Sequence, residues 1–290
     1  MNKQIKVVLL GTGTPNPVPE RSGPCVAIVV GDQSYLVDFG PGIVRRAEKA
    51  HRKGIKGLRP KNLKRAFLTH LHSDHTTGYP DLIYTPWVME RDEPLKVFGP
   101  KGIENMTMHL LKAYEVDINA RQNGFEKANS KGIKVIATDI NEGLIYEDEL
   151  VKVEAFLVNH PPFEAYGYRF TTHDKVVVVS GDTTPCENLV KYAKGCDILV
   201  HEVYSSQGIK NKDPKWFKYH TRVHTSSYEL GEIAAQVNPG LLVMYHQLFM
   251  VGNDESAAES IIQERVQEMI SEVKEKFNGE VVSGNDLDIF

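Results

Sequence analysis

The chain has 290 residues, 41% of them hydrophobic and 25% charged, with a formal net charge of −4 at pH 7. These values are typical of a soluble globular protein with a full hydrophobic core, and they give no general argument for a nucleic-acid-binding protein. The three cysteines, Cys25, Cys186 and Cys196, are too few and too unevenly spaced for a disulfide framework. We therefore expect a reducing, cytoplasmic location, and no apolar run approaches the ~20 residues that a membrane span needs.

Short runs rich in β-branched residues recur along the chain, each bounded by Gly, Pro, Asp or Asn, and this punctuation predicts strands. Two of the runs are uniformly apolar, Val26–Val30 and Val176–Val179, which predicts strands buried on both faces. The predicted strands are, in chain order, Val7–Leu10, Val26–Val30, Tyr35–Val37, Ala66–Leu68, Lys96–Phe98, Ile133–Ile136, Val151–Val158, Tyr166–Phe170, Val176–Val179, Ile198–Val200 and Leu241–Tyr245.

Helical periodicity falls between these runs and is clearest in Glu255–Phe277, where apolar residues recur every three or four positions among Glu and Lys. No Pro-, Gly- or Ser-rich linker divides the chain, so we expect a single domain over residues 1–290 with helices outside layered sheets. The other predicted helices are Ile43–Arg52, His75–Met89, Ile103–Tyr114, Glu187–Lys194 and Ser226–Gln236.

The hexapeptide His70-Leu71-His72-Ser73-Asp74-His75 directly follows a predicted strand. His70 and His72 are two residues apart, so an extended backbone points both imidazoles to one side. Asp74 and His75 lie in the turn that follows. Four potential ligands within six residues suit two neighbouring metal ions better than one. Imidazole and carboxylate without thiolate favour zinc, manganese or iron and argue against a structural zinc finger.

Three more candidate ligands, His160, Asp182 and His246, follow predicted apolar strands. A lone His or Asp at a strand end is more often a cap or a hydrogen-bonded core residue. Because such loops converge on one edge of a sheet, their shared placement with the hexapeptide favours a metal site. Glu202 and His224 form a pair of another kind, in which the carboxylate can orient the imidazole as a proton donor. The alternative is that Glu202 is a structural partner and His224 a helix-start residue.

Together these residues resemble the metallo-β-lactamase superfamily, and within it the ribonuclease Z and arylsulfatase-like branch. The resemblance covers nearly the whole chain in order and spacing. It implies an α/β fold, a four-layer αββα sandwich with metals at one edge of the sheets. The motifs that carry it are Gly11-Thr12-Gly13-Thr14-Pro15, Val37-Asp38-Phe39-Gly40, His70 to His75, His160 with Gly167-Tyr168-Arg169-Phe170, Gly181-Asp182-Thr183, His201-Glu202, His224-Thr225-Ser226 and His246.

The resemblance also implies residue roles and a cofactor, two Zn²⁺ ions with Mn²⁺ or Fe²⁺ as alternatives. Asp38 would brace the metal loop, as metal sites commonly require. Asp74 would also position or deprotonate the attacking water, and Glu202 and His224 would relay protons. The implied metal ligands are His70, His72 and His160 for one ion, Asp74, His75 and His246 for the other, and Asp182 as the bridge.

The implied function is a dinuclear zinc-dependent hydrolase that cleaves phosphodiester or related sulfate esters through a metal-activated water. Asp182, rather than a Cys, is what the phosphodiester-cleaving branches carry. Two departures separate the chain from the tRNA-processing members of the family. Arg169–Lys175 predicts a short hairpin in place of their long arm, and the residues after His246 lack their Ser and Arg. A small anionic ester is therefore the expected substrate.

Two other functions stay open. One is a tRNA 3′-end processing endoribonuclease with RNA as its partner, and the other is a non-catalytic metal- or ligand-binding protein of the same fold. We expect no membrane partner, and analogy with the branch suggests a homodimer. Arg45–Arg65, with ten Lys or Arg and one acid, is either a solvated surface or an anion-attracting one. Ser205–Arg222, which contains Trp216, is either a lid over an aromatic or apolar substrate or a surface loop.

Overall fold

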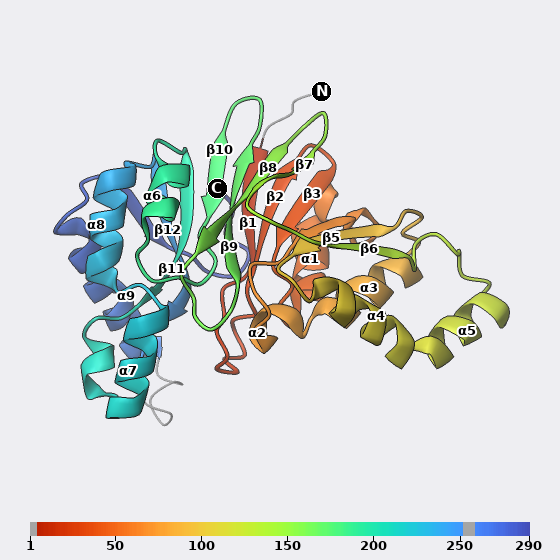
Figure 1. Cartoon of the computed structure of the whole chain (residues 1–290), viewed down its shortest axis with the longest axis horizontal. Coiled ribbons are helices and arrows are strands. Elements are labelled where there is room, and N and C mark those ends of the chain that lie inside the picture. Colours follow the sequence, from red (N-terminus) through yellow and green to blue (C-terminus); the bar gives the residue numbers. More distant parts are fainter. Residues whose placement is uncertain (1–4, 252–258) are drawn as a thin grey trace. The chain divides into compact units, whose positions relative to one another are not determined.

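The computed structural model describes residues 5–251 and 259–290, and the chain falls into two compact units. Unit 1 comprises Met1–Ile140 and Asn285–Phe290, and unit 2 comprises Asn141–Gly284. Each unit contains one mixed β-sheet with helices packed against it (Figure 1). Among the described residues, no helix combines the length and the apolar character that crossing a membrane requires.

Unit 1 is built on a six-stranded sheet in the order β1-β2-β3-β4-β5-β6. The pairs β1–β2 and β2–β3 are antiparallel, and the strands from β3 to β6 run parallel. The parallel strands deliver their loops to one edge of the sheet, where polar residues gather in α/β proteins. The bounds are β1 (Ile5–Gly11), β2 (Cys25–Val30), β3 (Gln33–Val37), β4 (Arg65–Phe67), β5 (Leu95–Gly99) and β6 (Val135–Asp139).

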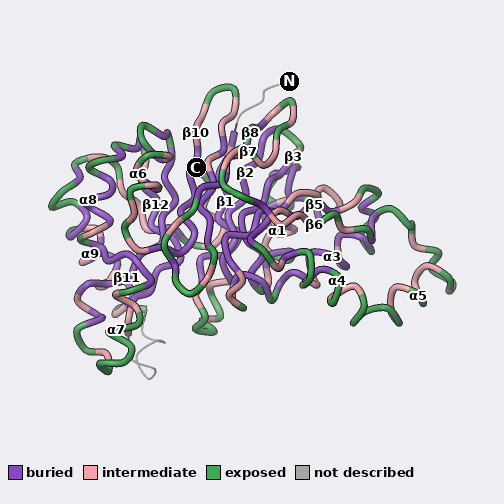
Figure 2. The backbone as a smooth tube through the Cα atoms, in the orientation of Figure 1, coloured by how far each residue is buried: buried purple, intermediate pink, exposed green. Residues whose placement is uncertain are grey.

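The core of unit 1 lies between the sheet and its helices. Strand residues such as Ala27 and Leu36 pack with the helix residues Ala47 and Leu82, and all four are buried. Helix α5 (Glu115–Asn123) differs from the others because none of its residues, all of which the structure describes, is buried (Figure 2). The remaining helices are α1 (Ile43–Arg52), η1 (Lys56–Leu58), η2 (Pro60–Asn62), α2 (Ser73–Thr76), α3 (Tyr79–Val88) and α4 (Ile103–Ala113).

Unit 2 is built on a seven-stranded sheet in the order β13-β12-β11-β10-β9-β8-β7. The strands β10 to β13 run parallel, whereas β7, β8, β9 and β10 form antiparallel pairs. The bounds are β7 (Gly143–Glu147), β8 (Lys152–Val158), β9 (Ala165–Thr171), β10 (Val176–Val179), β11 (Ile198–Tyr204), β12 (Leu241–Leu248) and β13 (Glu280–Ser283).

The core of unit 2 is formed where Leu199 and Met244 of the sheet pack with Leu230 and Met269 of the helices. Helix α8 begins with a capping box, in which the Ser226 hydroxyl and the side chain at the third helical position satisfy each other's backbone amides. The helices are α6 (Glu187–Ala193), η3 (Gly208–Asn211), α7 (Pro214–Val223), α8 (Ser227–Val237) and α9 (Glu259–Lys274).

Every predicted strand and helix has a counterpart, with differences that have physical causes. The predicted helix His75–Met89 is divided into α2 and α3. Thr77 and Gly78 lie between the two helices, and a proline stands in the first turn of α3. The predicted helix Glu255–Phe277 is observed as α9, and its residues 255–258 lie outside the described ones. Strands β7 and β13 and helices α5 and α7 were not predicted. The sequences of β7, β13 and α5 show weak apolar periodicity, whereas the helical spacing of Trp216, Tyr219 and Val223 in α7 is a signal that was missed.

The basic stretch Arg45–Arg65 extends from α1 to the start of β4. Several of its cations form ion pairs with nearby acids: Arg52 with Glu48, Lys64 with Glu93 and Arg46 with Asp286. The pairing reduces the net positive field that this stretch presents to an anion. Its contact with a substrate stays a prediction.

Candidate metal centre

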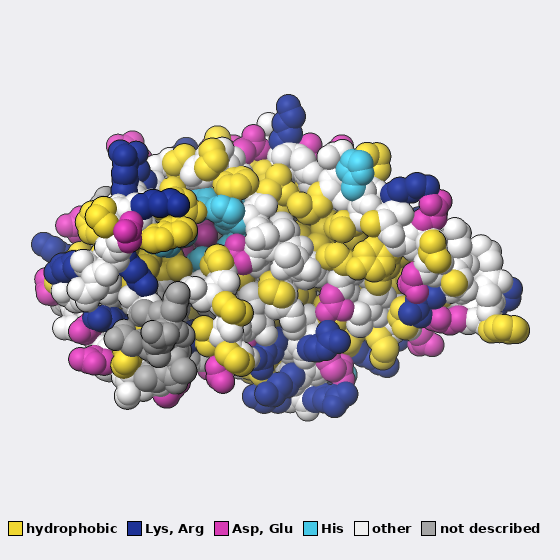
Figure 3. All heavy atoms as spheres, turned by 90° about the horizontal axis from the view of Figure 1, so that it is seen from below, with side chains coloured by type: hydrophobic (Ala, Val, Ile, Leu, Met, Phe, Trp, Pro, Cys, Tyr) yellow, Lys and Arg dark blue, Asp and Glu magenta, His cyan; other side chains and the backbone are white. Residues whose placement is uncertain are grey.

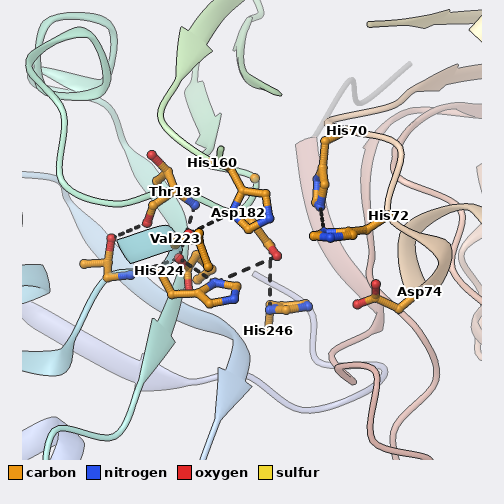
Figure 4. Close-up of polar contacts among 12 residues, drawn as sticks. His70, His72, Asp74, His160, Asp182, Thr183, Val223, His224 and His246 are labelled. Atoms are coloured by element: carbon orange, nitrogen blue, oxygen red, sulfur yellow. Dashed lines mark hydrogen bonds and ion pairs between the residues drawn. The ribbon is translucent and has the colours of Figure 1, made fainter. Parts of the chain in front are cut away.

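The hexapeptide of unit 1 brings two imidazole nitrogens close together. His70 follows strand β4, and His72 has the extended backbone of an N-cap, with φ −62° and ψ 149°, directly before α2. The Nε2 atom of His70 lies 2.8 Å from the Nδ1 atom of His72 (Figure 4). Two ring nitrogens this close face a common point, as two ligands of one cation do. The expectation that an extended backbone points both rings to one side is confirmed.

Asp38, directly after β3, anchors this loop from inside unit 1. Its Oδ1 atom accepts a hydrogen bond from the Thr69 amide at 2.8 Å. Its Oδ2 atom accepts from the Thr69 hydroxyl at 3.0 Å and lies 2.8 Å from Nδ1 of His75. Asp38 has a left-handed backbone with φ 64°, which is uncommon outside glycine and marks a position held by its surroundings.

These bonds determine which ring nitrogens carry lone pairs. A carboxylate only accepts, so His75 donates from Nδ1 and a neutral ring carries its lone pair on Nε2. The Thr69 hydroxyl donates to Asp38, so it accepts from Nδ1 of His70, 3.0 Å away. His70 therefore also carries its lone pair on Nε2. Thr69 was not singled out from the sequence, although its position directly before His70 was a signal.

Asp74 lies at the rim of the same loop. Its Oδ2 atom is 3.6 Å from Nε2 of His75, and its side chain is 11% exposed, whereas that of His75 is 1% exposed. The carboxylate is therefore the member of the pair that solvent reaches. A carboxylate in this position can ligate a cation and accept a proton from water.

The candidate ligands of unit 2 lie at the ends of β8 and β10 and within β12. The Nδ1 atom of His160 donates to the carbonyl of Val223 at 2.7 Å, which places the lone pair of the neutral ring on Nε2. The donor atoms of His160 and Asp182 lie within 4.8 Å of each other. The Oδ1 atom of Asp182 is 3.6 Å from Nδ1 of His246 (Figure 4). The Val223 carbonyl carried no sequence signal because it is a backbone group.

An irregularity in the sheet aims the His246 side chain. The sequence predicted that His246 follows a strand. His246 lies instead inside β12, because the strand continues to Leu248. Its backbone is left-handed with φ 44°, and the pairing of β11 with β12 shifts register between Glu202 and Val203. Such bulges re-aim side chains and occur next to active sites.

Glu202 and His224 form a buried pair in the same unit. The Oε1 atom of Glu202 lies 3.2 Å from Nδ1 of His224 and also accepts from the amides of Thr183 at 3.2 Å and Thr225 at 3.0 Å. Burial, and next the negative charge of Asp182, raise the pKa of Glu202 well above its usual value. Three donors thus fix one carboxyl oxygen, and that oxygen sets the orientation of the His224 ring.

His201 precedes Glu202 on β11, so its side chain points to the other side of the sheet. It is fully buried, and its Nδ1 atom donates to the carbonyl of Glu202 at 2.6 Å. Burial lowers the pKa of His201 to about 4, so the ring is neutral at pH 7. His201 is therefore a core imidazole and no candidate ligand.

The chain thus carries two His/Asp clusters, consistent with a dinuclear metal site. Nitrogen and oxygen donors without sulfur suit zinc, manganese or iron, as the sequence predicted, and do not distinguish among them. That the two clusters hold their ions together stays a prediction. The donors are His70, His72, Asp74 and His75 in unit 1, and His160, Asp182 and His246 in unit 2.

Sequence comparison places these residues within one known domain type. A profile described as "Beta-lactamase superfamily domain" matches residues 33–247, which include all seven candidate ligands from His70 to His246. A protein named ribonuclease Z from Mycobacterium marinum is 31% identical over 287 residues, covering 98% of this chain and 97% of its own. A ribonuclease Z from Mycobacterium bovis is 30% identical over 288 residues, covering 98% and 96%.

Solved structures agree on the fold. The metallo-β-lactamase fold protein YhfI from Bacillus subtilis matches with a TM-score of 0.72 at 18% identity, over 99% of this chain and 98% of that one. The short form of human tRNase Z matches with a TM-score of 0.69 at 19% identity, over 98% of both chains. These likenesses confirm the predicted α/β metallo-β-lactamase fold, which the structure shows as two mixed sheets flanked by helices.

Proposed function

The chain belongs to the metallo-β-lactamase superfamily, in its ribonuclease Z-like branch, and from this premise we propose that it is a phosphodiesterase that cleaves RNA at a dinuclear metal site. It is a metal-dependent hydrolase of that superfamily. The observation that carries the proposal is the similarity to proteins named ribonuclease Z over 98% of the chain. It favours the tRNA 3′-end processing alternative over the small anionic ester.

The proposed ligand sets follow the family pattern, with zinc as the expected metal and Mn²⁺ or Fe²⁺ as alternatives. Three rings, His70, His75 and His160, are held by hydrogen bonds at Nδ1 that leave the lone pair on Nε2, which supports their role as ligands. When bound, such ions lower the pKa of a bound water towards ~7 and neutralise charge on phosphate oxygens. One ion would be held by His70, His72 and His160, the other by Asp74, His75 and His246, with Asp182 between them.

The chain's own groups supply the proton transfers. Asp74, with its partly exposed carboxylate, would position the attacking water and take its proton. His224 would protonate the leaving oxygen of the ester, with Glu202 holding its ring in place. The presence of Asp74, Glu202 and His224 argues against the non-catalytic alternative.

A specific observation keeps the small ester as a second candidate. Strands β9 and β10 are joined by a tight turn, in which the backbone amide of Thr172 donates to the carbonyl of Lys175 at 3.0 Å. This fully described stretch has no room for an RNA-gripping arm. In addition, Gln247, directly after His246, is buried and donates to the carbonyl of Gly284 at 2.9 Å. Its side chain is thus used inside unit 2, so RNA binding would need another surface.

The experiment compares two substrates. The purified chain, loaded with zinc or manganese, is incubated with a precursor tRNA that carries a 3′ trailer and, separately, with bis-p-nitrophenyl phosphate. We expect cleavage of the RNA at the trailer, and a loss of at least about a hundredfold in Asp74→Ala. The matched control is Asp174→Ala in the β9–β10 turn, whose side chain is 46% exposed. Activity on the small ester alone would favour the second candidate, and no activity on either would refute the proposal.

A further inference from the structure

Helix α7 of unit 2 exposes an unusual combination of aromatic and cationic side chains. Trp216, Phe217 and Tyr219 are 48%, 43% and 37% exposed, respectively. The segment from Gly208 to His224 holds five Lys or Arg and one acid, although the whole chain has a net charge of −4. The acid is Asp213, whose side chain caps the helix by accepting from the amide of Lys215 at 2.8 Å. The local charge is therefore opposite to that of the protein.

The cations of α7 form a stripe. Lys215, Lys218 and Arg222 are spaced three and four residues apart, which places them on one helix face. All three are exposed. Within the part of the chain that the structure describes, none of them pairs with an acid. Lys215 lies over the ring of Trp216, with Nζ 5.2 Å from the centroid. These ammonium and guanidinium groups are available to an anionic partner.

A row of rings leads from the exposed Trp216, which Lys215 contacts, to the candidate proton donor His224. The ring of Trp216 is 6.0 Å from that of His220 at an interplanar angle of 31°. The ring of His220 is in turn 5.6 Å from that of His224 at 29°. Burial, and next the charges of His224 and Lys212, lower the pKa of His220 to about 4, so its ring is neutral at pH 7. The row thus leads from solvent to the Glu202–His224 pair.

From this arrangement we infer that α7 binds a single strand of RNA, with bases stacked on Trp216 and Tyr219 and phosphates beside Lys215, Lys218 and Arg222; the inference rests on the proposed RNA phosphodiesterase function. Aromatic rings beside a cationic groove or stripe are how proteins hold single strands without reading sequence. Figure 3 shows hydrophobic, cationic and acidic side chains together on the side of the molecule where α7 lies. The surface would take the place of the arm that the β9–β10 turn lacks.

The helix geometry also gives a distance along the strand. Trp216 and His224 are eight residues apart, or ~12 Å at 1.5 Å per residue. A stacked strand advances ~3.4 Å per nucleotide, so the base on Trp216 would lie about three or four nucleotides from the bond that His224 helps to break. A mononucleotide ester would not reach Trp216, whereas a short oligonucleotide would.

The test is a binding measurement on the full-length, zinc-loaded chain. The probe is a fluorescent twelve-nucleotide uridine strand with phosphorothioate linkages, which resist hydrolysis, followed by anisotropy. We expect Trp216→Ala to weaken binding about tenfold, with Trp216→Phe restoring most of it, because stacking is sequence-tolerant and needs only a ring. The control Phe125→Ala removes a fully exposed ring of unit 1 and should bind like the wild type.

A second binding experiment tests the cationic stripe. The double variant Lys218→Ala/Arg222→Ala should bind more weakly and show a salt dependence shallower by about 1.4 in the logarithmic slope, the value for two lost phosphate contacts on a single strand. Lys274→Ala/Lys276→Ala, two exposed lysines at the end of α9, is the matched control and should keep the wild-type slope.

The outcomes are separable. Equal binding by Trp216→Ala and Phe125→Ala would overturn the inference even if the wild type cleaves RNA. So would equal competition by polyglutamate or by an abasic strand of the same length, because these anions have no bases to stack. If the α7 variants lose binding as expected but the wild type cleaves no RNA, the proposed catalytic function fails and the binding surface stands.

Discussion

The Nδ1 atom of His75 lies 2.8 Å from Oδ2 of Asp38, a residue 37 positions earlier in the chain. Both side chains are 1% exposed, so the bond is shielded from water. The same carboxylate holds the Thr69 amide at 2.8 Å. One buried acid therefore orients an imidazole and shapes the loop that carries the other donors of unit 1.

Asp38→Ala should weaken metal binding by about ten- to a hundredfold, because the His75 ring loses the partner that fixes its lone pair. The urea-unfolding free energy of the metal-free protein should also fall by about 1–3 kcal/mol, since the buried Thr69 amide loses its acceptor. Metal titration and urea unfolding measure the two effects. Asp92→Asn, at a side chain 79% exposed, is the control. Wild-type metal affinity in Asp38→Ala would contradict the bracing role.

His224→Ala should lower kcat for RNA cleavage by about a hundred- to ten-thousandfold, as expected for loss of a general acid. The loss should be much smaller for bis-p-nitrophenyl phosphate, because p-nitrophenolate leaves without protonation. Glu202→Gln should show the same dependence on the leaving group with a smaller loss, since it weakens the hold on the His224 ring. Equal losses on both substrates would assign His224 to binding or structure.

The stability of the folded chain should depend on His201 below neutral pH. Burial lowers the pKa of His201 from 6.5 to about 4, so between these values the unfolded state binds a proton that the folded state does not. This contribution to the unfolding free energy is constant above pH 6.5 and becomes unfavourable as the pH falls towards 4. At pH 5 it amounts to about 2 kcal/mol.

Urea unfolding of the metal-free protein at pH 7 and pH 5 measures this effect. His201→Leu should lose about 2 kcal/mol of the difference between the two pH values. The control His173→Leu, at a side chain 53% exposed, should keep it. The pKa of His220 is lowered to about 4 in both proteins, so it cancels in the comparison. An unchanged difference in His201→Leu would mean that its ring is not buried in the neutral form.

Chelation of the metal should lower the melting temperature reversibly, because ions that bind only the folded state stabilise it by about 2.7 kcal/mol at a hundredfold excess over Kd. Zinc should restore it in the wild type and in Asp174→Ala, whose changed residue lies in the exposed β9–β10 turn. In Asp182→Ala the zinc-induced shift should be largely lost. A full shift in that variant would exclude Asp182 as a ligand.

The sequence predicted most of the fold because its apolar runs and turn residues are local signals. Val176–Val179 is a strand with the predicted bounds, and His70 and His72 face one point because alternation is a local property of an extended backbone. The hydrogen bonds that orient the ligands could not be predicted from the sequence. His160 is held by the carbonyl of Val223, 63 positions away, and a backbone group leaves no mark in a sequence.

Helix α7 was not predicted, for a different reason. Trp216, Tyr219 and Val223 recur at helical spacing, but the segment was read as a loop, and only Val223 among its residues is buried. Its start is nevertheless encoded by Asp213 as the cap and Pro214 at the first position, a pair of signals that the aromatic content of the segment obscured. The residues that make α7 unusual as a helix are those that make it a candidate binding surface.

The bulge at His246 sets a limit on how this protein can be stabilised. A regular ladder between β11 and β12 would remove the left-handed residue and improve the pairing, yet it would turn the His246 side chain away from Asp182. Selection for thermal tolerance alone should therefore favour variants that straighten the strand and lose hydrolysis. In a directed-evolution experiment, this position would be where gains in heat resistance and losses in turnover first coincide.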